Sequence, residues 1–219
     1  MKNKKKFHAQ VIDPLLSVIK HLSTENAFCI SETFYTYKQL GEAISSIRAE
    51  IKKVDKEDKY IGLITNDDLE TYASIIALWL EGKAYVPLHP HQPISRWEEI
   101  IDQMKIRSVL DSGKAFDGIS CTIIKTYDLT YQESFLSYDD SIEDSESAYI
   151  LFTSGSTGVP KGVIISRKNI GSFLDSFWDN GITLTKEDRC LQCFDLTFDV
   201  SIQSFLAPLT KGACVYKIP

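Results

Sequence analysis

Residues 148–165 read AYILFTSGSTGVPKGVII, a loop rich in glycine and hydroxyl side chains between two apolar runs. The runs AYILF and VII have the length and composition of buried β-strands. The glycines between them allow backbone N–H groups to converge on an anion, short hydroxyls add donors, and the lysine adds a positive charge. The sequence therefore predicts a phosphate-binding loop formed by Thr153, Ser154, Gly155, Ser156, Thr157, Gly158, Lys161 and Gly162.

Two better-known phosphate loops do not fit this stretch. A Walker loop requires G-x-x-x-x-G-K-[ST], but Lys161 follows Pro160 and precedes Gly162. A dinucleotide fingerprint opens a helix, whereas the apolar run VII that follows here predicts a strand. The loop is therefore expected to connect two strands, to be accessible to solvent, and to be mobile without its phosphate ligand.

The rest of the chain alternates predicted strands and helices, which indicates an α/β fold with mainly parallel, doubly wound sheets flanked by helices. Residues 28–30 and 34–36 predict a hairpin around Ser31 and Glu32. Further strands are expected at 60–65, 84–88, 108–111, 121–125, 189–194 and 212–218. Helices are expected to begin at Pro14, after a Thr36–Gln39 capping box, after Asn66 and Asp67, after a Ser95–Glu98 capping box, before Ile170 and at Asp199.

A change in composition suggests how the chain is divided. Residues 127–147 are rich in Asp, Glu and Ser and lack periodic apolar residues. We therefore expect a first α/β unit at 1–126, an acidic linker or surface excursion at 127–147, and a phosphate-loop unit at 148–219 that begins the substrate pocket.

Composition and charge exclude several classes of protein. The 219 residues carry a formal net charge of −6, which provides no electrostatic reason to bind nucleic acid or an anionic membrane. The basic start, residues 1–6, is not followed by an apolar run, so it predicts a frayed terminus and no secretory signal. The five cysteines form no dense framework, which favours a reducing, cytoplasmic compartment. Cys190 and Cys193 lack a second pair of ligands and are expected to pack in the core.

Four motifs in order resemble those of the adenylate-forming superfamily, which includes acyl-CoA synthetases, luciferase-like enzymes and nonribosomal-peptide adenylation domains. They are TFYTYKQL at 33–40, LWLEGKAYVPLHPHQP at 78–93, YILFTSGSTGVPKGV at 149–163 and FDLTFDVSIQSF at 194–205. Gly82, Pro87 and Arg96 are in register with the family, whereas Arg167 stands where the family often has His. The motifs cover nearly the whole chain.

The resemblance also indicates the substrate. In members that activate amino acids, an F-D-x-S motif carries an aspartate that pairs with the substrate's α-amino group, and Phe198-Asp199-Val200-Ser201 fits it. A buried ammonium needs such a charge partner. Val200 and Gln203 would face the side-chain pocket, so the implied substrate-binding residues are Asp199, Phe198, Val200 and Gln203. Without the resemblance, Asp199 could simply cap the helix that follows it.

The implied reaction forms an aminoacyl adenylate from ATP, with Mg²⁺, and passes the aminoacyl group to a phosphopantetheine carrier protein. The family's adenine-stacking aromatic, Mg²⁺-binding glutamate, ribose-binding aspartate and catalytic lysine match nothing before Pro219. We therefore expect an N-terminal portion that is inactive alone, with the start at Met1 favouring a free-standing enzyme of the D-alanine–carrier protein ligase type. The alternatives are an acyl- or aryl-CoA ligase, or a non-catalytic nucleotide-binding remnant.

Overall fold

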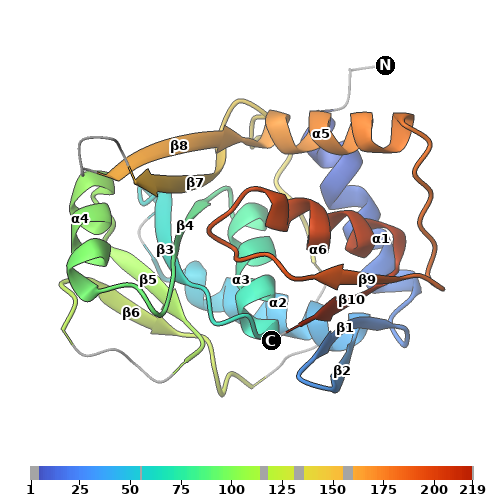
Figure 1. The fold of residues 1–219 in the computed structure, drawn as a ribbon, viewed down its shortest axis with the longest axis horizontal. Helices are drawn as coiled ribbons and strands as arrows, with labels where there is room; N and C mark the ends of the chain where they lie inside the picture. Colours follow the sequence, from blue (N-terminus) through green and yellow to red (C-terminus); the bar gives the residue numbers. More distant parts are fainter. Residues whose placement is uncertain (1–4, 55, 114–117, 131–135, 155–159, 219) are drawn as a thin grey trace.

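The computed structural model describes residues 5–54, 56–113, 118–130, 136–154 and 160–218, which form two sheets with helices between and around them (Figure 1). The larger sheet has the strand order β6-β5-β3-β4-β7-β8. Its strands are β3 (Tyr60–Ile64), β4 (Ala84–Leu88), β5 (Ser108–Asp111), β6 (Thr122–Lys125), β7 (Ser147–Ser154) and β8 (Pro160–Ser166). Among these described strands, the β7–β8 pair is antiparallel and the other pairs are parallel.

The smaller sheet has the order β2-β1-β10-β9 and joins the two ends of the chain. Its strands are β1 (Asn26–Ile30), β2 (Thr33–Thr36), β9 (Arg189–Gln192) and β10 (Cys214–Lys217). Strand β10 pairs in parallel with both β1 and β9, and β1 forms the predicted hairpin with β2. Both sheets thus combine strands from residues 1–126 with strands from residues 148–219, and the predicted division into two units and a linker stays a prediction.

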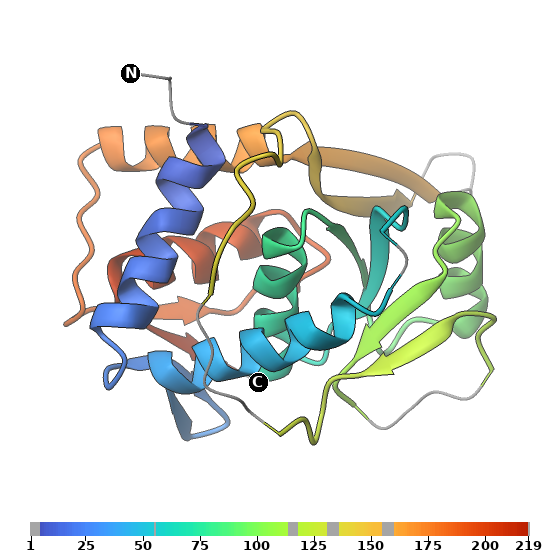
Figure 2. The same cartoon turned by 180° about the vertical axis from the view of Figure 1, so that it is seen from behind.

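The described helices are α1 (Asp13–His21), α2 (Tyr37–Ile51), α3 (Leu69–Leu80), α4 (Ile94–Met104), α5 (Arg167–Asp179) and α6 (Val200–Lys211). Every residue of α3 except Glu70 is buried, which explains why its sequence is mostly apolar on all sides. Helix α3 packs against α2, and α1 packs against α2 and α6. Figure 2 shows α1 and α2 together on one side of the molecule. No described helix is long and apolar enough to cross a membrane.

The predicted helix starts are partly confirmed. The Thr36–Gln39 capping box opens α2 as expected. Helix α3 is instead capped by Asp68, whose carboxylate accepts the N–H of Thr71 at 2.8 Å. The predicted cap by Asn66 and Asp67 is wrong, because both residues precede the N-cap position: the Asn66 amide donates to Asp111 and Ser112, and Asp67 has a left-handed φ of 58°. Helix α4 begins at Ile94, before Ser95, so Ser95 lies inside the first turn and the predicted Ser95–Glu98 capping box is wrong.

Helical structure also begins before Pro14. A short π-helix, η1 (His8–Ile12), runs directly into α1. The expected frayed terminus is wrong for Lys5 and Lys6, which bond to α5 and to the acidic stretch at 127–147. The Lys5 ammonium contacts Glu143 at 2.7 Å, and the Lys6 ammonium contacts Asp175 at 2.7 Å. Opposite charges therefore fasten the start of the chain to its second half.

Arg167 is fully buried at the first position of α5. Its guanidinium donates to the carbonyl oxygens of Trp79 at 3.3 Å and Lys83 at 3.1 Å, and lies 5.4 Å from the ring centroid of Phe7. Burial lowers the pKa of Arg167. Arg167 therefore holds the start of α5 against the end of α3 and the residue that precedes β4.

Candidate active site

The predicted phosphate loop lies between two neighbouring strands, as expected. Thr153 lies opposite Lys161, and Phe152 lies opposite Gly162, in the β7–β8 ladder. Directly opposed residues of an antiparallel pair share one face, so the hydroxyl of Thr153 and the ammonium of Lys161 project from the same face. Both residues are exposed. Ser154 ends β7; Gly155, Ser156, Thr157 and Gly158 lie outside the described residues, and so does the predicted mobility of the loop.

The close approach of two side chains explains why residue 162 is a glycine. A Cβ atom placed on Gly162 would lie 3.0 Å from Ile150 Cγ2 and 3.0 Å from Phe152 Cζ. That spacing is tighter than ordinary van der Waals contact, so the glycine lets β8 pack closely on β7 at the base of the loop. The proposed part of Gly162 in phosphate binding stays a prediction.

A cavity of about 340 Å³ brings together three of the four predicted substrate residues. Asp199, Val200 and Gln203 line it from the start of α6. The same cavity is lined by Tyr149, Ile165, Asn169, Ile170, Phe173 and Ile202. Phe198 is not among the lining residues, and 63% of its surface is exposed. The structure therefore gathers three of the predicted residues around one cavity, and Phe198 stands apart from them.

The position of Asp199 bears on whether it is only a helix cap. It precedes α6 at the N-cap position, but its φ of −63° and ψ of −31° are already helical and its side chain accepts no capping hydrogen bond. An N-cap residue normally has extended dihedrals and accepts the N–H of the second or third helical residue. The capping interpretation of Asp199 therefore fails, and the residue is one of those that line the cavity.

Tyr149 forms the part of the cavity wall contributed by β7. Its ring stacks on Tyr85 of the neighbouring strand at a centroid distance of 5.4 Å. Burial, followed by the negative charge of Asp199, raises the pKa of the Tyr149 phenol, so the phenol stays neutral. The cavity thus pairs an anionic carboxylate with a neutral hydroxyl and several apolar walls, an arrangement suited to a cationic group with a partly apolar neighbour.

Strand β7 connects the two parts of the site. Tyr149 lines the cavity, and Thr153 begins the phosphate loop four residues later on the same strand. At about 3.3 Å per residue, this separation is roughly 13 Å along the strand. Figure 1 shows the β7–β8 hairpin leading into α5, so one hairpin and the helix after it carry both the predicted anion site and one wall of the cavity.

Sequence reasoning did not identify Tyr149, Asn169 or Phe173 as cavity residues. The sequence pattern places Phe173 on the apolar face of its helix, yet 41% of its surface is exposed. Asn169 completes a capping box with Ser166, which sequence reasoning also missed. The sequence did hold a signal for these residues. Ser166 and Asn169 have the S-x-x-N spacing of a capping box, and Phe173 follows Asn169 one turn later on the same helix.

The two closely spaced cysteines follow the core prediction only in part. Cys190 is half-buried, whereas Cys193 is exposed beyond the end of β9. In the part of the chain that the structure describes, no group of three His, Cys, Asp or Glu residues could hold a metal ion. Core packing is therefore wrong for Cys193.

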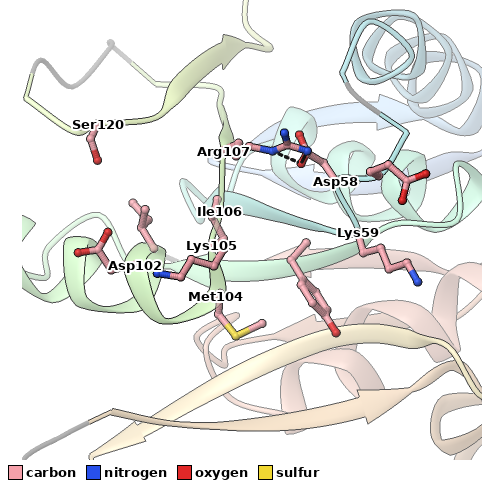
Figure 3. A pocket seen from close by; sticks show the side chains of 11 residues that line it. Asp58, Lys59, Asp102, Met104, Lys105, Ile106, Arg107 and Ser120 are labelled. Carbon is pink, nitrogen blue, oxygen red and sulfur yellow. Dashed lines mark hydrogen bonds and ion pairs between the residues drawn. The ribbon is translucent and has the colours of Figure 1, made fainter.

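A larger cavity, about 610 Å³, lies elsewhere (Figure 3). Its walls come from the residues before β3 and β5 and from the end of α4, at the amino ends of the parallel strands. Asp58 and Arg107 form an ion pair in its wall, and the Asp58 carbonyl oxygen accepts the ammonium of Lys83 at 2.7 Å. None of the predicted site residues lines this cavity, so the smaller cavity remains the candidate.

A family model and curated relatives match most of the chain. The model described as AMP-binding enzyme matches residues 20–219. A D-alanine–D-alanyl carrier protein ligase of Lactococcus lactis is 31% identical over 195 residues, covering 85% of this chain and 39% of the relative. A plipastatin synthase polypeptide of Bacillus subtilis is 32% identical over 200 residues, covering 88% of this chain and 8% of the relative. The chain thus spans about two-fifths or less of the length of these relatives.

Solved structures show the same fold. The N-terminal subdomain of Klebsiella oxytoca NpsA, in complex with 3-hydroxyanthranilyl-AMSN, superposes with a TM-score of 0.77 at 24% identity, covering 94% of this chain and 52% of that one. The four-domain nonribosomal peptide synthetase AB3403, bound to AMP and glycine, superposes with a TM-score of 0.81 at 25% identity, covering 95% of this chain and 16% of that one.

Proposed function

This chain belongs to the family of AMP-binding enzymes, and we propose that it forms the first part of a longer ATP-dependent ligase that activates an amino acid. The complete protein would form an aminoacyl adenylate and transfer the aminoacyl group to the phosphopantetheine thiol of a carrier protein. The relatives include a carrier protein ligase and peptide synthetases, which supports this substrate class. The 219 residues alone would be inactive, because they correspond to 39% of the carrier protein ligase.

One observation carries the proposal: Asp199 lines a cavity and makes no capping hydrogen bond to its own helix. A carboxylate in that position can pair with the α-ammonium of an amino acid and fix the direction in which the substrate enters. The walls contributed by Val200, Gln203 and Phe173 would then contact the substrate side chain.

The proposed chemistry takes place between the cavity and the phosphate loop. The substrate carboxylate oxygen attacks the α-phosphorus of ATP, a new P–O bond forms, and the bond to pyrophosphate breaks. Thr153 and Lys161, on one face of the hairpin, would hold the β- and γ-phosphates and stabilise the negative charge of the leaving pyrophosphate. In the second step the carrier thiol attacks the acyl carbon and AMP leaves. Mg²⁺, when bound with ATP, would neutralise phosphate charge.

Pyrophosphate exchange on the complete protein tests the proposal. Radioactive pyrophosphate should enter ATP in the presence of a particular amino acid and not with fatty or aromatic acids. Exchange that depends on fatty or aromatic acids would instead favour the acyl- or aryl-CoA ligase. A complete protein that binds ATP but exchanges with no acid in the panel would favour the non-catalytic remnant.

A further inference from the structure

A histidine that follows β4 contacts an aspartate four residues before Asp199. His89 follows β4, and its Nε2 lies 2.7 Å from Asp195 Oδ2, on the segment between β9 and α6. Both side chains are mostly buried, with 28% and 30% of their surfaces exposed. The contact therefore links the end of a strand in the larger sheet to the segment that leads into the cavity.

The hydrogen bonds of His89 define its tautomer. Its Nδ1 accepts the backbone N–H of His91 at 3.1 Å, so Nδ1 carries no proton in this arrangement. The ring proton then lies on Nε2, which donates to Asp195. The main chain around His89 is also held, because its carbonyl oxygen accepts the indole N–H of Trp97 at 3.0 Å. His89 is thus oriented as a fixed donor toward Asp195.

Asp195 in turn holds the segment that leads to Asp199. While Oδ2 accepts from His89, Oδ1 accepts both the backbone N–H and the hydroxyl of Thr197 at 2.7 Å each. The carbonyl oxygen of Asp195 accepts the N–H of Phe198 at 3.0 Å. This is a side-chain turn of the kind that Asp forms before a helix, and Asp199 follows it directly.

The His89 end of this contact follows β4, which is the strand next to β7 in the larger sheet. Strands β4 and β7 are parallel neighbours with Tyr85 opposite Tyr149. His89 directly follows β4, and Thr153 lies near the end of β7, so both residues lie on one of two neighbouring strands or directly after one. We propose that His89 is a positioning residue, which through Asp195 holds the segment carrying Asp199 in a fixed relation to the phosphate loop.

The assignment to an active site rests on the proposed function, so the test has two readouts. His89→Leu removes the donor and His89→Gln keeps an N–H donor near the same place. Gln92→Ala is the control, because Gln92 is exposed and bonds to His89 only through its backbone N–H. In the complete protein, we expect His89→Leu to raise the KM for the amino acid on the order of tenfold while the KM for ATP changes less than about twofold. His89→Gln should recover most of the loss, and Gln92→Ala should behave as the wild type.

Hydrogen exchange on the same complete protein provides the readout that does not depend on activity. His89→Leu should speed amide exchange at residues 196–202 and leave β3 and β4 unchanged. Unchanged exchange at 196–202 would overturn the proposal whatever the substrate is, and so would faster exchange throughout the chain with equal rises in both KM values. If exchange rises locally but the wild type activates no amino acid, the positioning role stands and the proposed function fails.

Discussion

Asp199 is the residue whose charge, in the proposed function, decides the class of substrate. Asp199→Asn preserves the shape of the side chain but removes the negative charge. Since the carboxylate makes no capping hydrogen bond, we expect little change in stability, within about 0.5 kcal/mol. In pyrophosphate exchange, kcat/KM for the amino acid should fall roughly a hundredfold or more. This corresponds to a loss of several kcal/mol in transition-state binding.

A des-amino analogue is the control for Asp199→Asn, because it lacks the group that the carboxylate would pair with. The substitution should affect its reaction much less. An Asp199→Asn protein that exchanges pyrophosphate with amino acids at the wild-type rate would remove the basis for the amino-acid assignment.

Lys161 is expected to act on ATP. It is exposed opposite Thr153, at the base of the predicted phosphate loop. Lys161→Ala should weaken ATP use by about 1.5–3 kcal/mol, the usual effect of losing a hydrogen bond to a charged group, with little effect on amino-acid binding. Exposed Lys168 provides the control, and its replacement by Ala should leave ATP kinetics unchanged. Equal ATP kinetics for both variants would argue against the phosphate role.

Two cysteines should differ in reactivity. Cys214 is buried in β10, and burial raises the pKa of its thiol to about 11, so only about 0.1% would be ionised at pH 8. Because the thiolate is the nucleophile, iodoacetamide should modify exposed Cys193 well before Cys214. Peptide mass spectrometry over time would show the order, and early labelling of Cys214 would contradict its burial.

At the scale of the element, Arg167 anchors the start of α5. Arg167→Ala removes two hydrogen bonds to carbonyl oxygens and the contact with Phe7, and it leaves a cavity. We expect a loss of about 2–4 kcal/mol in the free energy of unfolding. Denaturant unfolding of the complete protein measures this, with exposed Lys168→Ala as the neighbouring control. Equal free energies of unfolding for the Arg167→Ala protein and the wild type would contradict the anchoring role of Arg167.

At the scale of the whole molecule, the start of the chain closes over α5. A Cβ atom on Gly171 would lie 2.6 Å from both the backbone carbon of Lys6 and the backbone nitrogen of Phe7. Gly171→Ala should therefore displace residues 5–7 and destabilise the fold by about 1–3 kcal/mol. Ser172→Ala, one residue on, should change stability by less than about 0.5 kcal/mol. Limited proteolysis should also cut the Gly171→Ala protein sooner near its start.

The elements were largely predictable because each rests on local patterns. The capping box at Thr36, the buried run of α3 and the hairpin at Ser31 and Glu32 depend on neighbours a few residues away. The predictions failed where distant groups competed. Asn66 was predicted to cap α3, but it lies two residues before the N-cap and its amide donates to Asp111 and Ser112, while Asp68 caps the helix. Lys5 and Lys6 looked solvated because their acidic partners lie more than 130 residues away.

The sequence by itself determined the family, the α/β class, the hairpin that carries the predicted phosphate loop, and the placing of Asp199, Val200 and Gln203 around one cavity. It could do so because these depend on local spacing and a recognisable order of motifs. Only the tertiary structure decided that Asp199 does not cap its helix, that Phe198 stands outside the cavity, and that Tyr149 and Phe173 line it. The link from His89 to Asp195 crosses 106 residues of sequence, and contacts at that range are set by how two sheets pack together.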